Sequence, residues 1–222
     1  IYAAESASSV SVTSSVGDNL ISIYGAMLEE GSYPTSYIPT SGTTVTRLQD
    51  SSGTTGLSSV INSVEGVLYA EIAALADDLT NRHISLSDGT NGNRIVIQYD
   101  GVSNRISASL RNNYVFQASF NYDVADITEM HKISFKYKAN DFALWVDGVE
   151  VATDTSGTTF TANALTVFRF DRGDGVTQPM YGRVQDLQIY PTALTNEQLT
   201  DLTGTVHTSF NSLALSLGYT IV

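Results

Sequence analysis

Short runs of alternating apolar and polar residues, separated by turn residues, constrain this chain more than any other feature. From Glu65 to Tyr190 such runs recur every 10 to 12 residues, with Gly, Asn and Asp between them. This spacing is typical of an antiparallel sandwich, whereas a parallel sheet would show helical patterns between its strands. The sequence therefore predicts an all-β fold, with strands expected at 66–75, 82–86, 94–99, 104–110, 114–120, 132–137, 142–147 and 181–190.

The second half of the chain carries the clearest local signals. Asp147-Gly148 joins two alternating runs, and this dipeptide favours a two-residue hairpin turn. Thr195 precedes a polar run with Gln198 three residues later, which is the pattern of a helix N-cap and its capping box. The sequence predicts a last strand that leads into one short helix near the C-terminus.

Four of these segments resemble, in the same order, those of a laminin-G-like domain of the concanavalin A-like lectin/glucanase superfamily. The similar segments are the opening core strand at 66–71, the central hairpin at 132–137 and 142–148, the aromatic-Gly strand at 181–190 and the helix at 193–199. The resemblance covers roughly Glu65 to Leu202. It implies an antiparallel jelly-roll β-sandwich, which suggests a fold but not a function.

The remaining segments suggest a division of the chain. Residues 1–30 hold two short alternating runs, expected to end a preceding β-sandwich or to serve oligomerisation. Residues 31–64 are a connector rich in Pro, Gly, Ser and Thr, in which Leu57, Val60 and Ile61 are spaced for one helical turn or a covering loop. Residues 65–203 are expected to form the domain that resembles laminin-G-like domains, and 204–222 are expected to be a C-terminal packing tail.

The composition of the chain excludes several classes of binding partner. A net charge of −12 argues against nucleic acid, because phosphate contacts need clustered Lys and Arg. No apolar run approaches the roughly 20 residues that span a bilayer, so membrane insertion is not expected. The chain has no Cys and so cannot form a disulfide or a thiolate metal site. Its many Ser and Thr residues suit exposed β-structure in extracellular or virion proteins.

The connector carries a second resemblance. The run LEEGSYPTSYIPTSGTTVTR, at 28–47, is similar to a junction of phage and prophage virion proteins that leads into a laminin-G-like domain. It implies a location on the virion surface, with other virion proteins as partners. The two N-terminal strands cannot bury a core by themselves, which suggests a homo-oligomer, with a trimer favoured as in fibres.

Two loops supply candidate ligands for a sugar or a metal ion, at 87–93 and 171–175. Their carboxylate and amide oxygens suit calcium, although Asp, Asn and Gly also simply form turns. The calcium candidates are Asp88, Asp171 and Asp174. The candidate carbohydrate-binding residues are Asp88, Asn91, Asn93, Tyr114, Arg172 and Asp174.

Aromatic and basic side chains are further candidates. Tyr99, Tyr114, Trp145 and Tyr181 are possible platforms for a sugar ring, although Trp145 alternates with Leu144 and Val146 as a core residue would. Arg169 and Arg172, close to Asp171 and Asp174 in sequence, are expected to form a solvated ion-pair cluster.

Catalytic patterns do not emerge from the acids or the histidines. Glycosidases use a pair of closely placed carboxylates, yet Glu71 is followed by a loop and Asp147 and Glu150 stand at a hairpin tip. His83, His131 and His207 lie far apart without metal-ligand spacing. The domain is therefore not expected to be an enzyme.

Three functional hypotheses remain. The first is a fibre, spike or tail-associated module on the virion surface that binds a bacterial cell-surface glycan. The second is a purely structural domain that decorates a capsid or tail. The third is a carbohydrate-binding module of a bacterial polysaccharide-degrading enzyme.

Overall fold

The computed structural model describes residues 27–28, 36–39, 43–46 and 52–204. The chain divides into two compact units, Ile1–Leu48 and Gln49–Val222, and the strands and helix below belong to the second. The strands predicted within 1–30 and the tail predicted from 205 onwards lie outside the described residues.

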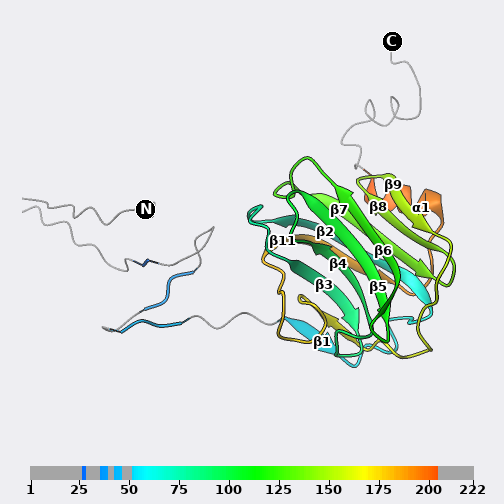
Figure 1. Ribbon diagram of the computed structural model, residues 1–222, viewed down its shortest axis with the longest axis horizontal. Helices are drawn as coiled ribbons and strands as arrows, with labels where there is room; N and C mark the ends of the chain where they lie inside the picture. Colours follow the sequence, from blue (N-terminus) through cyan, green and yellow to red (C-terminus); the bar gives the residue numbers. More distant parts are fainter. Residues whose placement is uncertain (1–26, 29–35, 40–42, 47–51, 205–222) are drawn as a thin grey trace, which may run out of the picture. The chain divides into compact units, whose positions relative to one another are not determined.

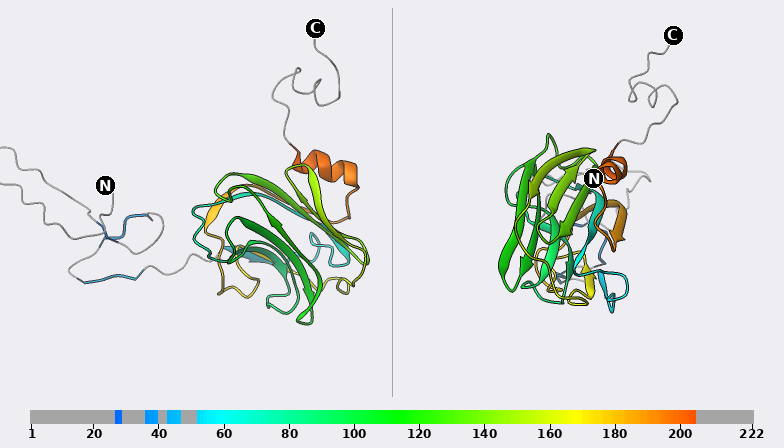
Figure 2. Two further views of the ribbon diagram at one scale, coloured as in Figure 1. Left: turned by 45° about the horizontal axis from the view of Figure 1, so that its top comes forward. Right: turned by 90° about the vertical axis from the view of Figure 1, so that its right-hand side faces the viewer.

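Two antiparallel sheets form the second unit and stack as two layers (Figures 1 and 2). The six-stranded sheet has the order β1 (Gly53–Thr55), β10 (Val167–Arg169), β3 (Arg82–Ser87), β4 (Arg94–Tyr99), β5 (Arg105–Asn112), β6 (Val115–Asp123). The five-stranded sheet has the order β11 (Gly182–Tyr190), β2 (Glu65–Ala74), β7 (His131–Lys138), β8 (Phe142–Val146), β9 (Val149–Asp154). The predicted all-β antiparallel β-sandwich is confirmed.

Apolar side chains at alternate strand positions fill the space between the sheets. On β4, for example, Ile95, Ile97 and Tyr99 are all fully buried. The hydroxyl of Tyr99 donates a hydrogen bond to the carbonyl of Ile72 at 3.0 Å. Tyr99 is therefore a core residue, and its interpretation as a sugar platform was wrong because its strand parity points it inward.

The hairpin between β8 and β9 turns at Asp147 and Gly148, as predicted. Both residues have positive φ, 49° and 86°, which is the signature of a type I′ turn. The Asp147 carboxylate also accepts a hydrogen bond from the Lys132 amide at 2.9 Å. The turn is therefore fixed both by its backbone and by a contact with the neighbouring strand.

Helix α1 (Asn196–Thr203) covers part of the outer face of the five-stranded sheet. Its N-cap is Thr195, and the capping box with Gln198 is present as predicted. Leu199 packs with Trp145 in a second apolar cluster, apart from the main core. Trp145 is thus buried, but beneath α1 instead of between the sheets. Within the described ranges, no helix has the length and apolar character that crossing a membrane requires.

The sandwich begins earlier than the sequence indicated. Strand β1 lies inside the segment predicted as connector and pairs with β10 through residues 53–55. The turn predicted from Leu57 is present, since its carbonyl accepts from the amides of Val60 and Ile61, and Ile61 is buried. β1 was missed because its three residues, Gly-Thr-Thr, are all exposed and show no apolar alternation.

Candidate functional site

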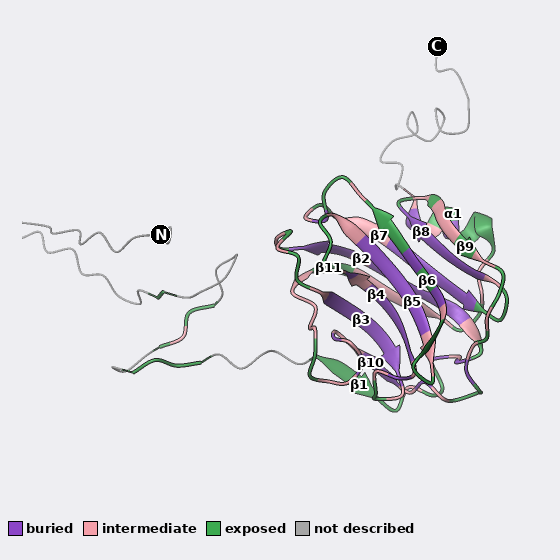
Figure 3. Ribbon diagram, viewed as in Figure 1, coloured by how far each residue is buried: buried purple, intermediate pink, exposed green. Residues whose placement is uncertain are grey.

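A pocket of about 390 Å³ lies on the outer face of the six-stranded sheet. Sheet faces that point away from a sandwich core are usually exposed, but here β3 is buried along its whole length (Figure 3). One reason is that the loop at 170–181 contacts this face: Ser87 donates a hydrogen bond to the Gly173 carbonyl at 3.0 Å, and the Gln178 carbonyl lies 3.3 Å from Nδ1 of His83.

Strand register arranges the pocket side chains in cross-strand rows. One row joins Arg94 on β4, Arg111 on β5 and Phe116 on β6. Four residues along the strands, a second row joins His83, Gln98, Ser107 and Asn121. Ser109 and Ser119 lie opposite one another between these rows and also line the pocket. Its floor is thus basic and aromatic at one end and neutral and polar at the other.

Three arginines meet at the basic end. Arg94 and Arg111 come from the sheet, and Arg172 comes from the loop between β10 and β11. Burial, together with the charges of Arg172 and Arg111, lowers the pKa of Arg94 to about 10, although the charge of Asp174 opposes this shift. Among the described residues, the Nε atoms of all three are buried and have no hydrogen-bond partner. This end therefore holds positive charge and unused donors.

Neighbouring loops hold two of these guanidinium groups. Nη1 of Arg94 donates to the Asn91 carbonyl at 2.8 Å, and Nη2 of Arg111 donates to the Tyr114 carbonyl at 3.1 Å. The guanidinium carbon of Arg111 also lies 4.6 Å from the ring centre of Phe116, a cation–π contact. Phe116 is 54% exposed, so the ring offers apolar surface at the pocket wall.

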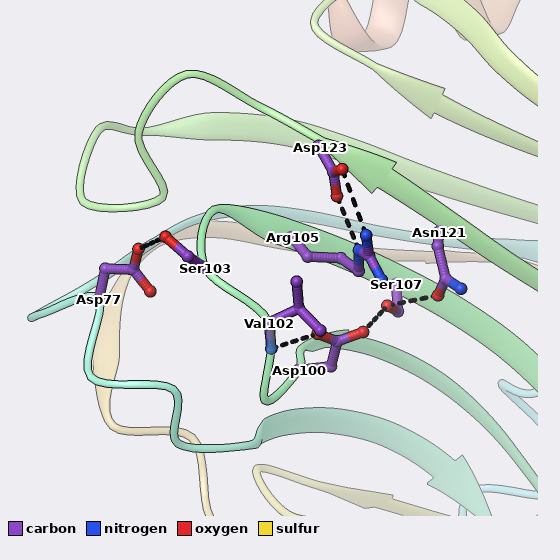
Figure 4. A network of polar contacts seen from close by, with 8 residues as sticks. All are labelled: Asp77, Asp100, Val102, Ser103, Arg105, Ser107, Asn121 and Asp123. Carbon is purple, nitrogen blue, oxygen red and sulfur yellow. Dashed lines mark hydrogen bonds and ion pairs between the residues drawn. The ribbon is translucent and has the colours of Figure 1, made fainter.

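Hydrogen-bonding side chains form the other end. The Ser107 hydroxyl lies 2.6 Å from Oδ2 of Asp100 and 2.8 Å from Oδ1 of Asn121 and can donate to either (Figure 4). Beside this group, Arg105 donates to Asp123 at 2.7 Å (Figure 4). Burial lowers the pKa of His83 to about 4, so its imidazole is neutral at pH 7.

The predicted calcium ligands are engaged by their own loops. Asp88 accepts from the Thr90 amide at 2.9 Å and from Asn93 at 2.8 Å. Asp171 accepts from the amides of Gly173 and Gly175, and Asp174 from those of Val176 and Thr177. In the part of the chain that the structure describes, no group of three or more His, Cys, Asp or Glu could hold a metal ion.

The arginines beside these acids also differ from expectation. Among the described residues, neither Arg169 nor Arg172 forms an ion pair with an acid within 4.0 Å. The predicted ion-pair cluster is therefore absent there, because Asp171 and Asp174 turn their oxygens to amides of the same loop.

The predicted carbohydrate-binding residues occupy different places. Arg172 lines the 390 Å³ pocket. Asn93 lines a second pocket of about 320 Å³, which is walled mainly by Asn and Thr. The others, Asp88, Asn91, Tyr114 and Asp174, line neither pocket. Asn91 and Tyr114 contribute indirectly, because their backbone carbonyls accept hydrogen bonds from Arg94 and Arg111.

Sequence reasoning missed most of the pocket: His83, Arg94, Gln98, Ser107, Arg111 and Phe116. A signal was available, because Arg94 and Gln98 alternate with the apolar Ile95, Ile97 and Tyr99 on one short strand. Such parity places both on the outer face, but it does not show that a loop from residues 170–181 encloses that face.

Comparisons with known proteins agree with this architecture. The Ruminococcus gnavus IT-sialidase CBM40 is 18% identical with a TM-score of 0.56, covering 71% of this chain and 95% of that chain. The structure of the same CBM40 bound to α2,3-sialyllactose is also 18% identical, with a TM-score of 0.57 and the same coverage of both chains. A third similar structure is domain 4 of AbnA, a GH43 arabinanase from Geobacillus stearothermophilus, in complex with arabinotriose. It is 16% identical with a TM-score of 0.51, covering 66% of this chain and 69% of that chain.

No curated protein sequence matches the chain. Residues 70–200, more than half of its length, match a laminin-G-type family model described as the concanavalin A-like lectin/glucanases superfamily. The match lies within the segment Glu65 to Leu202, where the sequence resemblance was found, and spans strands of both sheets. The chain therefore belongs to the concanavalin A-like lectin/glucanases superfamily.

Proposed function

We propose that this domain binds carbohydrate in the 390 Å³ pocket and does not catalyse a reaction. The observation that carries the proposal is the pocket floor, where alternate residues of four neighbouring strands present amide, hydroxyl and guanidinium groups beside one exposed ring, Phe116. Sugar hydroxyls both donate and accept hydrogen bonds, and such side chains complement them. An aromatic face adds apolar contact for a sugar ring.

Similar proteins support this proposal without deciding it. The CBM40 structure contains sialyllactose, and the arabinanase domain contains arabinotriose. Both share only the fold with this chain, and a fold alone does not determine function. The pocket is the independent support, because its polar lining is a property of this sequence.

In the biological setting that we favour, a virion fibre, spike or tail-associated protein uses this domain to attach to a bacterial cell-surface glycan. The support is the resemblance of residues 28–47 to a virion junction. Such a module is extracellular, adjoins other virion proteins and acts as a homo-oligomer, with a trimer favoured. Several linked copies raise the effective concentration of a weak site. Light scattering that detects only monomer at high protein concentration would contradict the proposed homo-oligomer.

A carbohydrate-binding module of a secreted polysaccharide-degrading enzyme is the second candidate. Two of the similar structures are named as a module of a sialidase and a domain of an extracellular arabinanase. The pocket chemistry is the same in both settings. Identifying what is fused to or assembled with the full-length protein separates them, since a catalytic domain favours the enzyme and a particle-anchoring segment favours the virion.

The direct test is a glycan array and a whole-cell binding assay with the chain clustered on beads. A matched pair of variants on β6 reports on the pocket. Phe116→Ala removes the exposed ring, whereas Val115→Ala alters its similarly exposed neighbour, which does not line the pocket. Binding that Phe116→Ala weakens and Val115→Ala preserves supports the proposal. No binding by the clustered chain contradicts it and favours the purely structural role.

A further inference from the structure

We propose that the glycan is acidic, and that its anionic group, a carboxylate or a sulfate, binds among Arg94, Arg111 and Arg172. This inference rests on the proposed function and adds the chemical class of the ligand. Its first basis is charge. Three of the chain's 11 lysines and arginines line one pocket of a protein with net charge −12, and none of the described residues lining that pocket is Asp or Glu.

The arrangement of these arginines is costly without an anion. Arg94 and Arg111 are opposite partners in the register of β4 and β5, and like charges directly opposite across strands destabilise a sheet. Arg94 is only 4% exposed, so water compensates its charge poorly. An anionic ligand would offset both the desolvation and the repulsion.

Arginines with a structural role look different in the same sheet. Arg82 lies 2.6 Å from Asp78, and Arg105 lies 2.7 Å from Asp123. Within the described part of the chain, Arg94, Arg111 and Arg172 have no such carboxylate partner within 4.0 Å. The charge of Asp174 acts on Arg94 and Arg172, but Asp174 does not line the pocket. The pocket therefore lacks the directly paired carboxylate that Arg82 and Arg105 have.

The guanidinium groups are also held in position. Arg94 and Arg111 each use one terminal nitrogen on a loop carbonyl, which leaves other N–H groups for a ligand, since a guanidinium has five. Planar guanidinium groups bind carboxylates and other oxyanions through two parallel hydrogen bonds. Groups that are fixed before binding lose less entropy when they bind.

The neutral end of the pocket indicates the length of the ligand and the chemistry of its uncharged part. Gln98 and Ser107 stand opposite one another, four residues from the arginine row. At about 3.3 Å per strand residue, the two rows are roughly 13 Å apart, which exceeds the length of one pyranose ring. The ligand is therefore an oligosaccharide with its acidic sugar at the arginines and uncharged hydroxyls toward Gln98 and Ser107.

Matched acidic and neutral probes test the inference by calorimetry. The pairs are 3′-sialyllactose with lactose, and a galacturonate trimer with its methyl ester; a heparin oligosaccharide is the sulfate arm. We expect the acidic member of at least one pair, or the heparin probe, to bind about ten- to a hundredfold more tightly than neutral sugar. The probe that binds shows whether the anionic group is a carboxylate or a sulfate.

Arginine variants then show which side chains bind the anionic group of the ligand. Arg111→Gln and Arg172→Gln should each remove about tenfold or more of the affinity for the acidic probe, and Arg111→Lys should restore only part of it, since Lys lacks the planar fork. Arg105→Gln, on the same strand but paired with Asp123, is the matched control and should bind like the parent chain. Circular dichroism confirms that each variant is folded.

Two results separate this inference from the proposed function. Neutral glycans that bind as tightly as acidic ones, with no effect of Arg111→Gln or Arg172→Gln, overturn the acidic ligand and leave carbohydrate binding in place. Failure of every acidic and neutral glycan to bind the clustered chain overturns both.

Discussion

Arg94 on β4 lies directly opposite Arg111 on β5, on the outer face of the six-stranded sheet. Arg94 is 4% exposed and, within the described residues, has no carboxylate partner. The other buried arginine of this sheet, Arg82, is 1% exposed and pairs with Asp78 at 2.6 Å. Residues kept at a cost to stability are often functional, so the contrast between Arg94 and Arg82 is informative.

This contrast predicts opposite effects of the same substitution. Arg94→Met removes a buried charge and its repulsion from Arg111, so the melting temperature should stay constant or rise. Arg82→Met removes the hydrogen-bonded ion pair between Arg82 and Asp78 and should destabilise the fold by about 1.5 to 3 kcal/mol. Thermal unfolding by circular dichroism measures both. A loss for Arg94→Met as large as that for Arg82→Met contradicts the interpretation.

His131 and Asp147 predict a pH dependence at the other sheet. Nδ1 of His131 donates to Asp147 at 2.6 Å, and Nε2 lies 3.0 Å from the Asp126 carbonyl. Both ring nitrogens face acceptors, which favours the imidazolium because it has two donors. The hydrogen bond with Asp147 raises the pKa of His131, although burial opposes it, and the charges of Asp147 and Asp126 add to the rise.

The sign of the effect follows from these shifts. Burial would raise the pKa of Asp147, but hydrogen bonds from His131 and Lys132 lower it below its usual range. The His131 contribution is therefore complete below about pH 6.5 and is lost as pH rises through the raised pKa. The Asp147 contribution is present above about pH 4 and is lost as pH falls further.

Urea unfolding across pH checks this prediction. The parent chain should exceed His131→Gln in stability most between about pH 4 and 6.5, by under about 1 kcal/mol, since Asp147 is partly exposed. Asp147→Asn, which suits the positive φ of the turn, should give the same profile. A difference that does not change with pH indicates that the imidazolium contributes nothing.

The helix and the strands with apolar alternation could be predicted because their signals are local, whereas the exposed strand β1 could not. Ile95, Ile97 and Tyr99 alternate along β4, and Thr195 caps α1 with Gln198 three residues later. The pocket could not be predicted because it depends on contacts distant in sequence. Ser87 and Gly173, which join β3 to the enclosing loop, are 86 residues apart.

The parity of a strand shows which residues share a face but not which face becomes a site. Arg94 and Arg111 lie on separate strands, and their opposition follows from register, which no single run of sequence reveals. Asn91 and Tyr114 were predicted as sugar contacts from their residue types, but the structure shows their backbone carbonyls holding arginines. Residue type alone cannot distinguish these two roles.

Leu199 should control how α1 covers the sheet. It is fully buried in the cluster that contains Trp145, and truncation of such a side chain costs about 2 to 4 kcal/mol. Leu199→Ala should lower stability by this amount and shift the emission of Trp145, the single tryptophan of the chain, to longer wavelength. Asp201→Ala, exposed on the same helix, should change stability by less than about 0.5 kcal/mol. Unchanged emission for Leu199→Ala contradicts this account.

Calcium should have no effect on the stability of the domain. Asp88, Asp171 and Asp174 already accept hydrogen bonds from the loops that contain them, and a calcium ion would compete with these contacts for the carboxylate oxygens. A ligand that binds only the folded state raises the melting temperature, so melting with calcium and with a chelator measures the prediction directly. Equal melting temperatures are expected. A rise with calcium that Asp88→Asn, Asp171→Asn or Asp174→Asn abolishes would restore the metal site first suggested by the sequence.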